Sequence, residues 1–180
     1  PFFIRVLRRL RPDEGWLVYL LALGVVLTLP YAAVDSALVP GLRPAIWLSF
    51  LGLSFSWWLA YRPRLPGIAA AFILGGAGIV ATLAWGVQVL RVGPLAGQVA
   101  RWIAWRMGGQ TAPEPSITYF GDQWDALAGY GQRIVWWLDG LVNGPGVPDN
   151  LVVIGLAGLV AWCFAAWAGW WIARRGQSFV

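Results

Sequence analysis

The chain has 180 residues, of which 59% are hydrophobic and 12% are charged, and its formal net charge is +5. Soluble domains are about a quarter charged, so this composition excludes an ordinary soluble protein and indicates an integral membrane protein. All thirteen basic residues are arginines at segment ends, and because they form no continuous stripe they argue against nucleic-acid binding. With no histidine and one cysteine, the chain lacks an internal disulfide and the usual ligands of haem, zinc and iron–sulfur centres.

Four apolar segments reach the length of about 20 residues that a helix needs to cross the hydrocarbon core of a bilayer. They cover residues 16–34, 45–61, 68–90 and 151–173. Asp13 and Glu14 suit the start of the first helix, and Asp149 or Asn150 is expected to cap the last one. The sequence therefore predicts an all-α, polytopic transmembrane helix bundle of about four spans, organised as a single membrane domain over residues 1–180.

Residues 91–150, between the third and fourth predicted spans, are too polar to cross a bilayer. Apolar side chains recur there at helical spacing, first over residues 95–107 and then over residues 120–141. Such patterns are typical of amphipathic helices at a membrane surface. We expect two amphipathic interfacial helices, lying on the outer membrane surface or packed over the bundle, with a turn between them at residues 108–116.

Arginine is enriched in the cytoplasmic loops of membrane proteins. If the N-terminus is inside, the inner side holds eight arginines and two acids, whereas the longer outer side holds five arginines and six acids. The inner arginines that indicate this orientation include Arg8, Arg9, Arg62, Arg64, Arg174 and Arg175. We therefore expect a multi-pass protein of the bacterial inner (plasma) membrane with both termini in the cytoplasm.

The chain contains fourteen tryptophans, a side chain that favours the headgroup region of a bilayer. Five of them lie near the ends of predicted spans and are expected to be interfacial anchors: Trp16, Trp57, Trp58, Trp170 and Trp171. Trp162 and Trp167 lie deeper in the last span, where they could pack against neighbouring helices or contact a lipid, a quinone or a pigment. We expect no metal, and no cofactor other than such a bound molecule.

Small side chains recur at every fourth position on the second and third predicted spans. They are Gly52 and Ser56 on the second span, and on the third Ala71 and Gly75 in one series and Gly78, Thr82 and Gly86 in another. This spacing lets helices approach closely, on which helix association in lipid relies. We expect these residues to pack the bundle or to contact partner chains.

Cys163 lies in the middle of the last predicted span, between Trp162 and Phe164. A nucleophilic thiol needs a neighbouring base and access to water, so we expect this cysteine to be buried and inert. Asp122 and Asp125 share a helical face and could form an acid–base pair or bind calcium, although the spacing is common on solvated faces. No predicted span carries a charge at its centre, which disfavours ion transport. We expect no catalytic residue.

Three stretches resemble one bacterial family. They are RRLRPDEGWL at residues 8–17, YRPRLPG at 61–67 and PDNLVVIGLAGLVAWCFAAWAGWWIARRG at 148–176. Together they are similar to the N-terminal multi-helix region of Chloroflexi-type transglutaminase-like membrane proteins. The resemblance implies further helices and then an extracytoplasmic papain-like domain with a Cys-His-Asp triad. No triad residue carries over, because the chain has no histidine and Cys163 lies inside a span.

We accordingly expect a non-catalytic membrane anchor or scaffold, and the resemblance implies the N-terminal membrane region of a transglutaminase-like protein. Two alternatives stay open. One is an accessory structural subunit of a larger respiratory or photosynthetic complex, held through its aromatic outer helices. The other is a lipid-, quinone- or pigment-binding membrane protein. The expected partners are membrane lipids and other membrane subunits, and not nucleic acid.

Overall fold

The computed structural model describes residues 16–37, 39–62, 65–108, 118–144 and 149–176, and these residues form helices and turns without a strand. The helices are α2 (Trp16–Asp35), α3 (Arg43–Ala60), α4 (Gly67–Ala81), α5 (Val92–Gly108), α6 (Thr118–Asn143) and α7 (Asn150–Gly176), and a π-helical turn, η1 (Thr82–Gly86), continues α4. The predicted all-α class is confirmed for this part of the chain.

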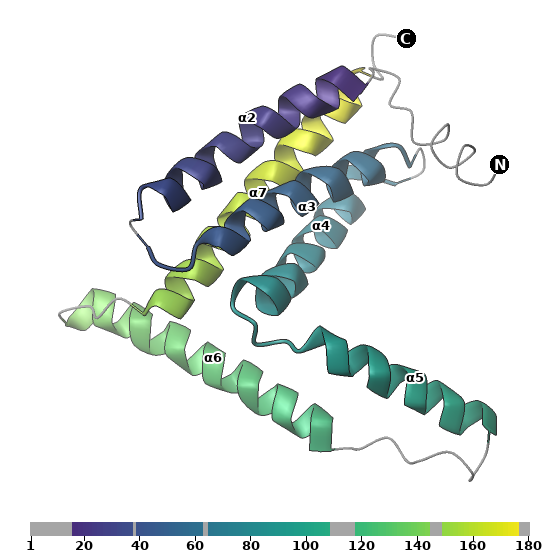
Figure 1. Cartoon of the computed structure of the whole chain (residues 1–180), viewed down its shortest axis with the longest axis vertical. Helices are drawn as coiled ribbons and strands as arrows, with labels where there is room; N and C mark the ends of the chain where they lie inside the picture. Colours follow the sequence, from purple (N-terminus) through teal and green to yellow (C-terminus); the bar gives the residue numbers. More distant parts are fainter. Residues whose placement is uncertain (1–15, 38, 63–64, 109–117, 145–148, 177–180) are drawn as a thin grey trace.

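Helices α2, α3, α4 and α7 form a bundle in which α3 and α7 share the most extensive contact, with α2 and α4 packed against this pair (Figure 1). Successive helices α2, α3 and α4 alternate in direction, and α7 runs parallel to α3 (Figure 1). The end of α3, the start of α4 and the end of α7 therefore lie together. We call this the arginine end, because Arg62 and Arg174 lie there.

The pairing of α3 and α7 depends on two glycines at which the helices nearly touch. A Cβ atom on Gly52 of α3 would lie 2.9 Å from the backbone oxygen of Trp162, and a Cβ atom on Gly169 of α7 would lie 3.0 Å from the backbone oxygen of Leu53. Close approach of this kind increases van der Waals contact, on which helix association in lipid relies. The two glycines thus fix the separation of the two central helices.

Helix α3 carries serines that face the inside of the bundle, and their hydroxyl groups form hydrogen bonds within the helix. Ser49 and Ser56 are buried, and each donates a hydrogen bond of 2.9 Å to a backbone oxygen of its own helix, that of Ala45 or Leu53. A buried hydroxyl without such a partner would be costly. The serines therefore let α3 occupy the middle of the bundle without needing polar partners on other helices.

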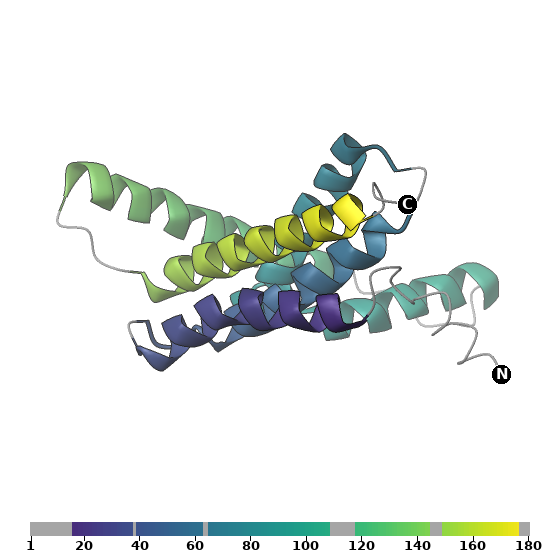
Figure 2. The same cartoon turned by 90° about the horizontal axis from the view of Figure 1, so that it is seen from above.

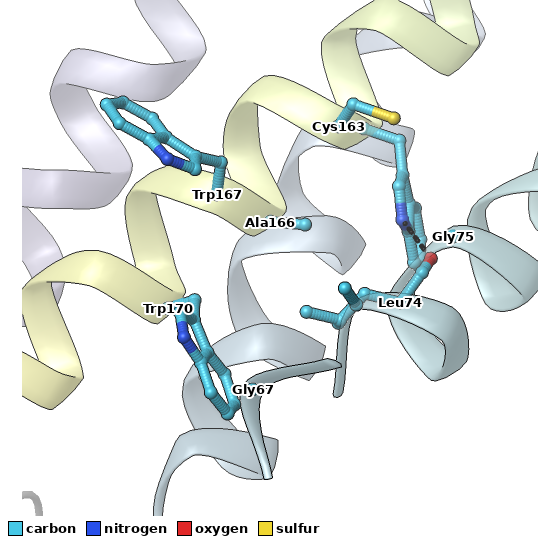
Figure 3. Close-up of a pocket in the computed structure, with 9 residues that line it drawn as sticks. Gly67, Leu74, Gly75, Cys163, Ala166, Trp167 and Trp170 are labelled. Carbon is cyan, nitrogen blue, oxygen red and sulfur yellow. Dashed lines mark hydrogen bonds between the residues drawn. The ribbon is translucent and has the colours of Figure 1, made fainter. Parts of the chain in front are cut away.

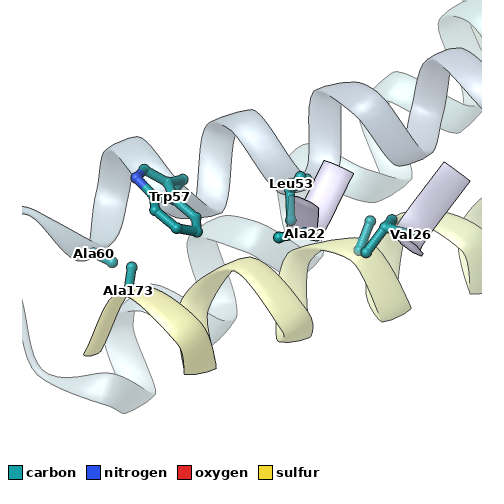
Figure 4. Packing of buried hydrophobic residues seen from close by; sticks show 7 residues of the cluster. Ala22, Val26, Leu53, Trp57, Ala60 and Ala173 are labelled. Atoms are coloured by element: carbon teal, nitrogen blue, oxygen red, sulfur yellow. The ribbon is translucent and has the colours of Figure 1, made fainter. Parts of the chain in front are cut away.

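Helix α2 packs on the α3–α7 pair through a cluster of buried apolar side chains (Figure 4). The cluster consists of Ala22, Val26, Leu53, Trp57, Ala60, Ala165 and Ala173. At its edge the ring of Tyr19 meets Trp57 edge-on, with ring centroids 5.4 Å apart, and the Tyr19 hydroxyl lies 2.7 Å from Oγ of Ser54. Helices α2 and α3 are thus joined by both apolar and polar contacts.

Among the described residues, three helical stretches are long and apolar enough to cross a membrane: Leu17–Asp35, Gly67–Gly86 and Asn150–Arg174. They correspond to the first, third and fourth predicted spans. The second predicted span, α3, is helical over 18 residues but falls outside this set. Its lower hydropathy comes from Arg43, Pro44 and its serines.

The third predicted span extends to residue 90, but the helix ends at Gly86. The last turn widens into η1, and the backbone of Gln88 then takes a left-handed conformation with φ of 55°. Non-glycine residues rarely adopt that conformation within a helix. The polypeptide therefore leaves the helical path four residues earlier than expected and turns into the segment that leads to α5.

Helices α5 and α6 extend away from the bundle at the end opposite the arginine end (Figures 1 and 2). Large apolar side chains on both helices are exposed, among them Trp102 and Ile103 on α5 and Trp124 and Trp136 on α6. Helix α6 touches the start of α7, whereas α5 has at most a marginal contact with any other described helix. The two expected helices are present, and their apolar faces are left uncovered.

Replacing Gly78 by alanine should destabilise the bundle, because the added Cβ would lie 2.5 Å from Cδ1 of Trp162. Overpacking of this kind costs about 1–3 kcal/mol. Gly76→Ala is the matched control, since a Cβ at Gly76 meets no atom within 4 Å and brings the same gain in helix propensity. Thermal unfolding of the purified proteins in detergent measures the difference. Equal midpoints for the two variants would contradict the close packing of Trp162 on Gly78.

Candidate functional site

A groove with a volume of about 230 Å³ opens between α4 and α7 (Figure 3). It is lined by Gly67, Ala71, Leu74 and Gly75 of α4 and by Trp162, Cys163, Ala166, Trp167 and Trp170 of α7. The α4 wall consists mainly of small side chains, and the α7 wall carries three indole rings. The structure thus brings together two groups of residues that the sequence singled out separately: the deep tryptophans and part of the small-residue pattern.

Trp162 forms the inner side of the groove. Its indole Nε1 donates a hydrogen bond of 3.0 Å to the backbone oxygen of Leu74 on α4 (Figure 3), and its ring packs closely against Gly78. The side chain is buried. Trp162 therefore joins α7 to α4, and its N–H group is already engaged.

Trp167 and Trp170 form the outer part of the same wall. Trp167 is 59% exposed and stacks on Trp171, with ring centroids 6.0 Å apart. The ring of Trp170 points towards Gly67 (Figure 3). The groove is therefore framed by aromatic rings on one side and by nearly bare backbone on the other.

Cys163 was expected to be buried, but its side chain is exposed and lines the groove. The reason is its position on α7: the face of the helix that carries Ala161, Ala165 and Ala166 is buried, and Cys163 lies outside that face. Because Cys163 lies in the middle of an apolar helix, its exposed side chain contacts the medium that surrounds the bundle.

The predicted small residues divide into two groups. Gly52, Gly78 and Gly86 lie against neighbouring side chains or backbone, and Ser56 and Thr82 are buried. A Cβ on Gly75, by contrast, would meet no atom within 4 Å, and Ala71 is exposed on the same side of α4. This second pair lines the groove.

The five expected interfacial anchors also occupy different environments. Trp57 is only 6% exposed and belongs to the core, because it faces α2 and α7 as well as the end of the bundle. Trp58 and Trp171 are exposed, and Trp170 is half-buried. Trp16 begins α2. Trp57 therefore differs from the expectation, since proximity to a span end did not indicate which way the side chain faces.

Two arginines that were predicted to act in topology alone make contacts at the arginine end, and Arg174 lies beside the groove. The guanidinium of Arg174 lies 4.6 Å from the centre of the Trp170 ring, and its Nη2 donates a hydrogen bond of 2.9 Å to the backbone oxygen of Leu65. Arg62 lies at the same distance from the Trp58 ring. The spacing of four residues between each tryptophan and its arginine is the signal that could have predicted both contacts.

The structure says little about the side chains of the other arginines that were used to predict the topology. Arg175 belongs to α7, and Arg8, Arg9 and Arg64 lie outside the described residues.

The carboxylates of α6 form no enclosed site. Asp122 and Asp125 are exposed, and within the described ranges no group of three histidine, cysteine or acidic residues could hold a metal ion. Asp149 accepts a hydrogen bond of 2.9 Å from the backbone N–H of Leu151 and thereby caps α7, as predicted. It also lies 3.5 Å from Arg133 of α6. These contacts orient α6 on the start of α7.

Tyr130 adds a second contact between α6 and α7. Its hydroxyl lies against Gly155, where a side chain would collide with it. Burial and the nearby carboxylate of Asp149 raise the pKa of Tyr130 above its ordinary value of 10.0. The neutral phenol is therefore the form that suits the packed state.

No family model, curated protein or solved structure matches the chain. The groove, its arginines and the uncovered faces of α5 and α6 are the features on which a functional proposal can be based.

Replacing Trp162 by phenylalanine should lower the free energy of unfolding, because the N–H donor to Leu74 is lost together with part of the ring that packs on Gly78. Interhelical hydrogen bonds in membrane proteins contribute about 0.6–2 kcal/mol. Trp167→Phe is the control, since that side chain is exposed. Reversible unfolding in mixed micelles measures both variants, and equal losses would contradict the assigned role of the hydrogen bond.

The raised pKa of Tyr130 predicts a loss of stability in alkaline solution. Because its pKa is higher in the folded state than in the unfolded state, its contribution is complete below about pH 10 and is lost as pH rises through the folded pKa. Tyr130→Phe should therefore reduce the fall of the unfolding midpoint above that pH. Tyr31→Phe, which changes an exposed side chain of α2, should leave the fall unchanged. A similar pH profile for all three proteins would refute the prediction.

Proposed function

We propose that this chain is a non-catalytic integral membrane anchor and scaffold with four spans. The spans would be α2, α3, α4 with η1, and α7. The observation that carries the proposal is the arrangement of the bundle: its helices run side by side with large apolar side chains exposed on the outside, such as Leu20, Leu21 and Val25 of α2. A surface of that kind is stable against lipid and unstable against water.

Helix α3 is included as a span for two reasons. Its 18 residues give a length of about 27 Å at 1.5 Å per residue, close to the bilayer core of about 30 Å. It also contacts α2, α4 and α7, and side chains along its whole length are buried, from Ala45 to Ala60, so that much of its surface faces protein instead of lipid. A helix in that position tolerates serines, because their hydroxyl groups bond within the helix.

We further propose that α5 and α6 lie on the membrane surface. Each has one face rich in exposed large apolar side chains, including Trp102 of α5 and Trp124 and Leu138 of α6. Both helices leave the bundle at the end where η1 stops and α7 begins (Figure 1). Amphipathic helices with aromatic residues bury such faces at the boundary between headgroups and acyl chains.

The arginine end is proposed to face the cytoplasm of a bacterial cell, with both termini on that side. Among the described residues, Arg62 and Arg174 lie at this end, whereas the carboxylates of α6 and Asp149 lie at the opposite end. The distribution of arginine is the strongest sequence determinant of orientation in the inner membrane.

The most specific form of the proposal is that the chain is the N-terminal membrane region of a transglutaminase-like protein, which the sequence resemblance supports. A reading frame that continues beyond Val180 into a Cys-His-Asp domain is the expected result of sequencing the gene. A stop codon shortly after Val180 would contradict this form of the proposal while leaving the anchor role in place.

A second candidate is an accessory structural subunit of a larger membrane complex. The observation that favours it is the isolation of α5, which leaves Trp102 and Ile103 exposed without a covering helix. Migration of the solubilised protein with a large complex on a native gel would support this candidate, and migration at its own mass would contradict it.

Labelling of single cysteines tests the four-span topology. In a Cys163→Ser background, Ser36→Cys and Asp122→Cys should react with a membrane-impermeant maleimide in intact cells, because both positions are exposed and lie on the proposed outer side. Arg62→Cys should react only after permeabilisation, which also serves as the control for reactivity. If α3 did not cross the membrane, Ser36→Cys and Arg62→Cys would lie on the same side and would be labelled alike.

A further inference from the structure

We propose that the groove between α4 and α7 holds one acyl chain of an anionic phospholipid from the leaflet at the arginine end, with its phosphate at the mouth of the groove near Arg174 and Arg62. The inference rests on the proposed membrane-spanning role and adds a specific partner to it.

The length of the groove matches one leaflet. It extends along α4 from Gly67 at the arginine end to Gly75, opposite Cys163 of α7. Eight residues of helix span about 12 Å, and half of a bilayer core is about 15 Å. An occupant that enters at the headgroup level and stops near the middle of the membrane therefore fits the groove along its length.

The walls suit an aliphatic chain better than a polar ring system. The N–H group of Trp162 already donates to the backbone oxygen of Leu74, so it cannot orient a quinone or a pigment. The volume of about 230 Å³ is also below the range of about 300–1,000 Å³ that is usual for cofactor pockets. An acyl chain needs apolar contact alone, which the indole rings and the small residues of α4 supply.

Charge at the mouth of the groove selects the headgroup. Arg174 is held there by its stacking on Trp170 and its hydrogen bond to Leu65, two residues before Gly67. Arg62 is held at the same end by its stacking on Trp58. Guanidinium groups form strong charge-assisted hydrogen bonds with phosphate, and neither arginine has to reorganise its backbone to meet a ligand.

The carboxylates of the described residues lie at the end of the bundle opposite these arginines. They are Asp35, Asp122, Asp125, Asp139 and Asp149. A second copy of the chain is the competing occupant, since Ala71 and Gly75 would also admit a helix. The arginines at this end of the bundle attract an anionic lipid. They would repel a second copy of the chain, because its surface carries the same arginines.

Native mass spectrometry of the purified full chain tests the proposal. Palmitoyl-oleoyl phosphatidylglycerol and the phosphatidylcholine with the same chains are added in turn, and the bound fraction is followed against lipid concentration. The anionic lipid should bind about fivefold more tightly. Gly75→Leu should weaken its binding about tenfold, because the new side chain occupies the groove. Gly76→Leu is the matched control and should bind like the unchanged chain, since both glycines have open space around Cβ.

Variants at Arg174 separate headgroup recognition from acyl-chain burial. Arg174→Gln should reduce binding of phosphatidylglycerol about fivefold and leave binding of phosphatidylcholine nearly unchanged. Arg174→Lys keeps the charge and should retain most of the preference for the anionic lipid. Equal binding of the two lipids to the unchanged chain would overturn the proposal, as would equal effects of Gly75→Leu and Gly76→Leu.

Cys163 gives a readout in the unchanged chain that does not depend on how the variants fold. Because its side chain lines the groove, bound phosphatidylglycerol should slow its reaction with N-ethylmaleimide, and phosphatidylcholine at the same concentration should slow it less. An unchanged rate would overturn the proposal. A dimer that disappears in Gly75→Leu alone would assign the groove to a second copy.

The outcome of cysteine labelling of the topology in cells does not depend on lipid binding in the groove. A failure of the lipid proposal is therefore distinguishable from a failure of the anchor proposal.

Discussion

Gly52 and Gly169 bring α3 and α7 into backbone contact, and the other helices of the bundle take their positions from that pair. Helix α2 closes over it through the apolar cluster that includes Leu53, and α4 joins it through the indole of Trp162. In lipid the hydrophobic effect supplies little attraction between helices, so association depends on how closely they fit. The separation set by two glycines therefore decides whether the remaining contacts can form at all.

The two sides of α7 illustrate how unevenly that fit is distributed. Helix α7 has a far more extensive contact with α3 than with α4, and two contacts of α7 on the side of α4 border the groove. One is the packing of Trp162 on Leu74 and Gly78, and the other is the hydrogen bond from Arg174 to the backbone of Leu65. Between these two contacts the helices do not fill the space between them. The groove thus lies between a contact in the middle of α7 and a contact near its end, with the small residues of α4 in between.

Much of the fold could be predicted from the sequence, because segment length and apolarity suffice to locate long helices, and Asp149 marked the start of α7. The orientation of individual side chains could not. Helices that are apolar on all sides give no periodic signal for the face that meets protein, which is why Trp57 proved buried and Cys163 exposed. For the groove, Trp162 and Trp167 were singled out, but the role of Arg174 depends on a contact with a residue far away in the sequence.

The backbone N–H of Arg91 donates a hydrogen bond of 3.0 Å to the side-chain oxygen of Gln123, and this bond ties the entry to α5 to an early turn of α6. The segment between Arg91 and Gln123, which includes α5, is therefore a loop whose two ends are held together. Lengthening such a loop costs little free energy of closure, about 0.6 kcal/mol for each doubling of its length. Homologous or engineered chains could therefore carry larger or different segments at this position, while the helices of the bundle keep their register.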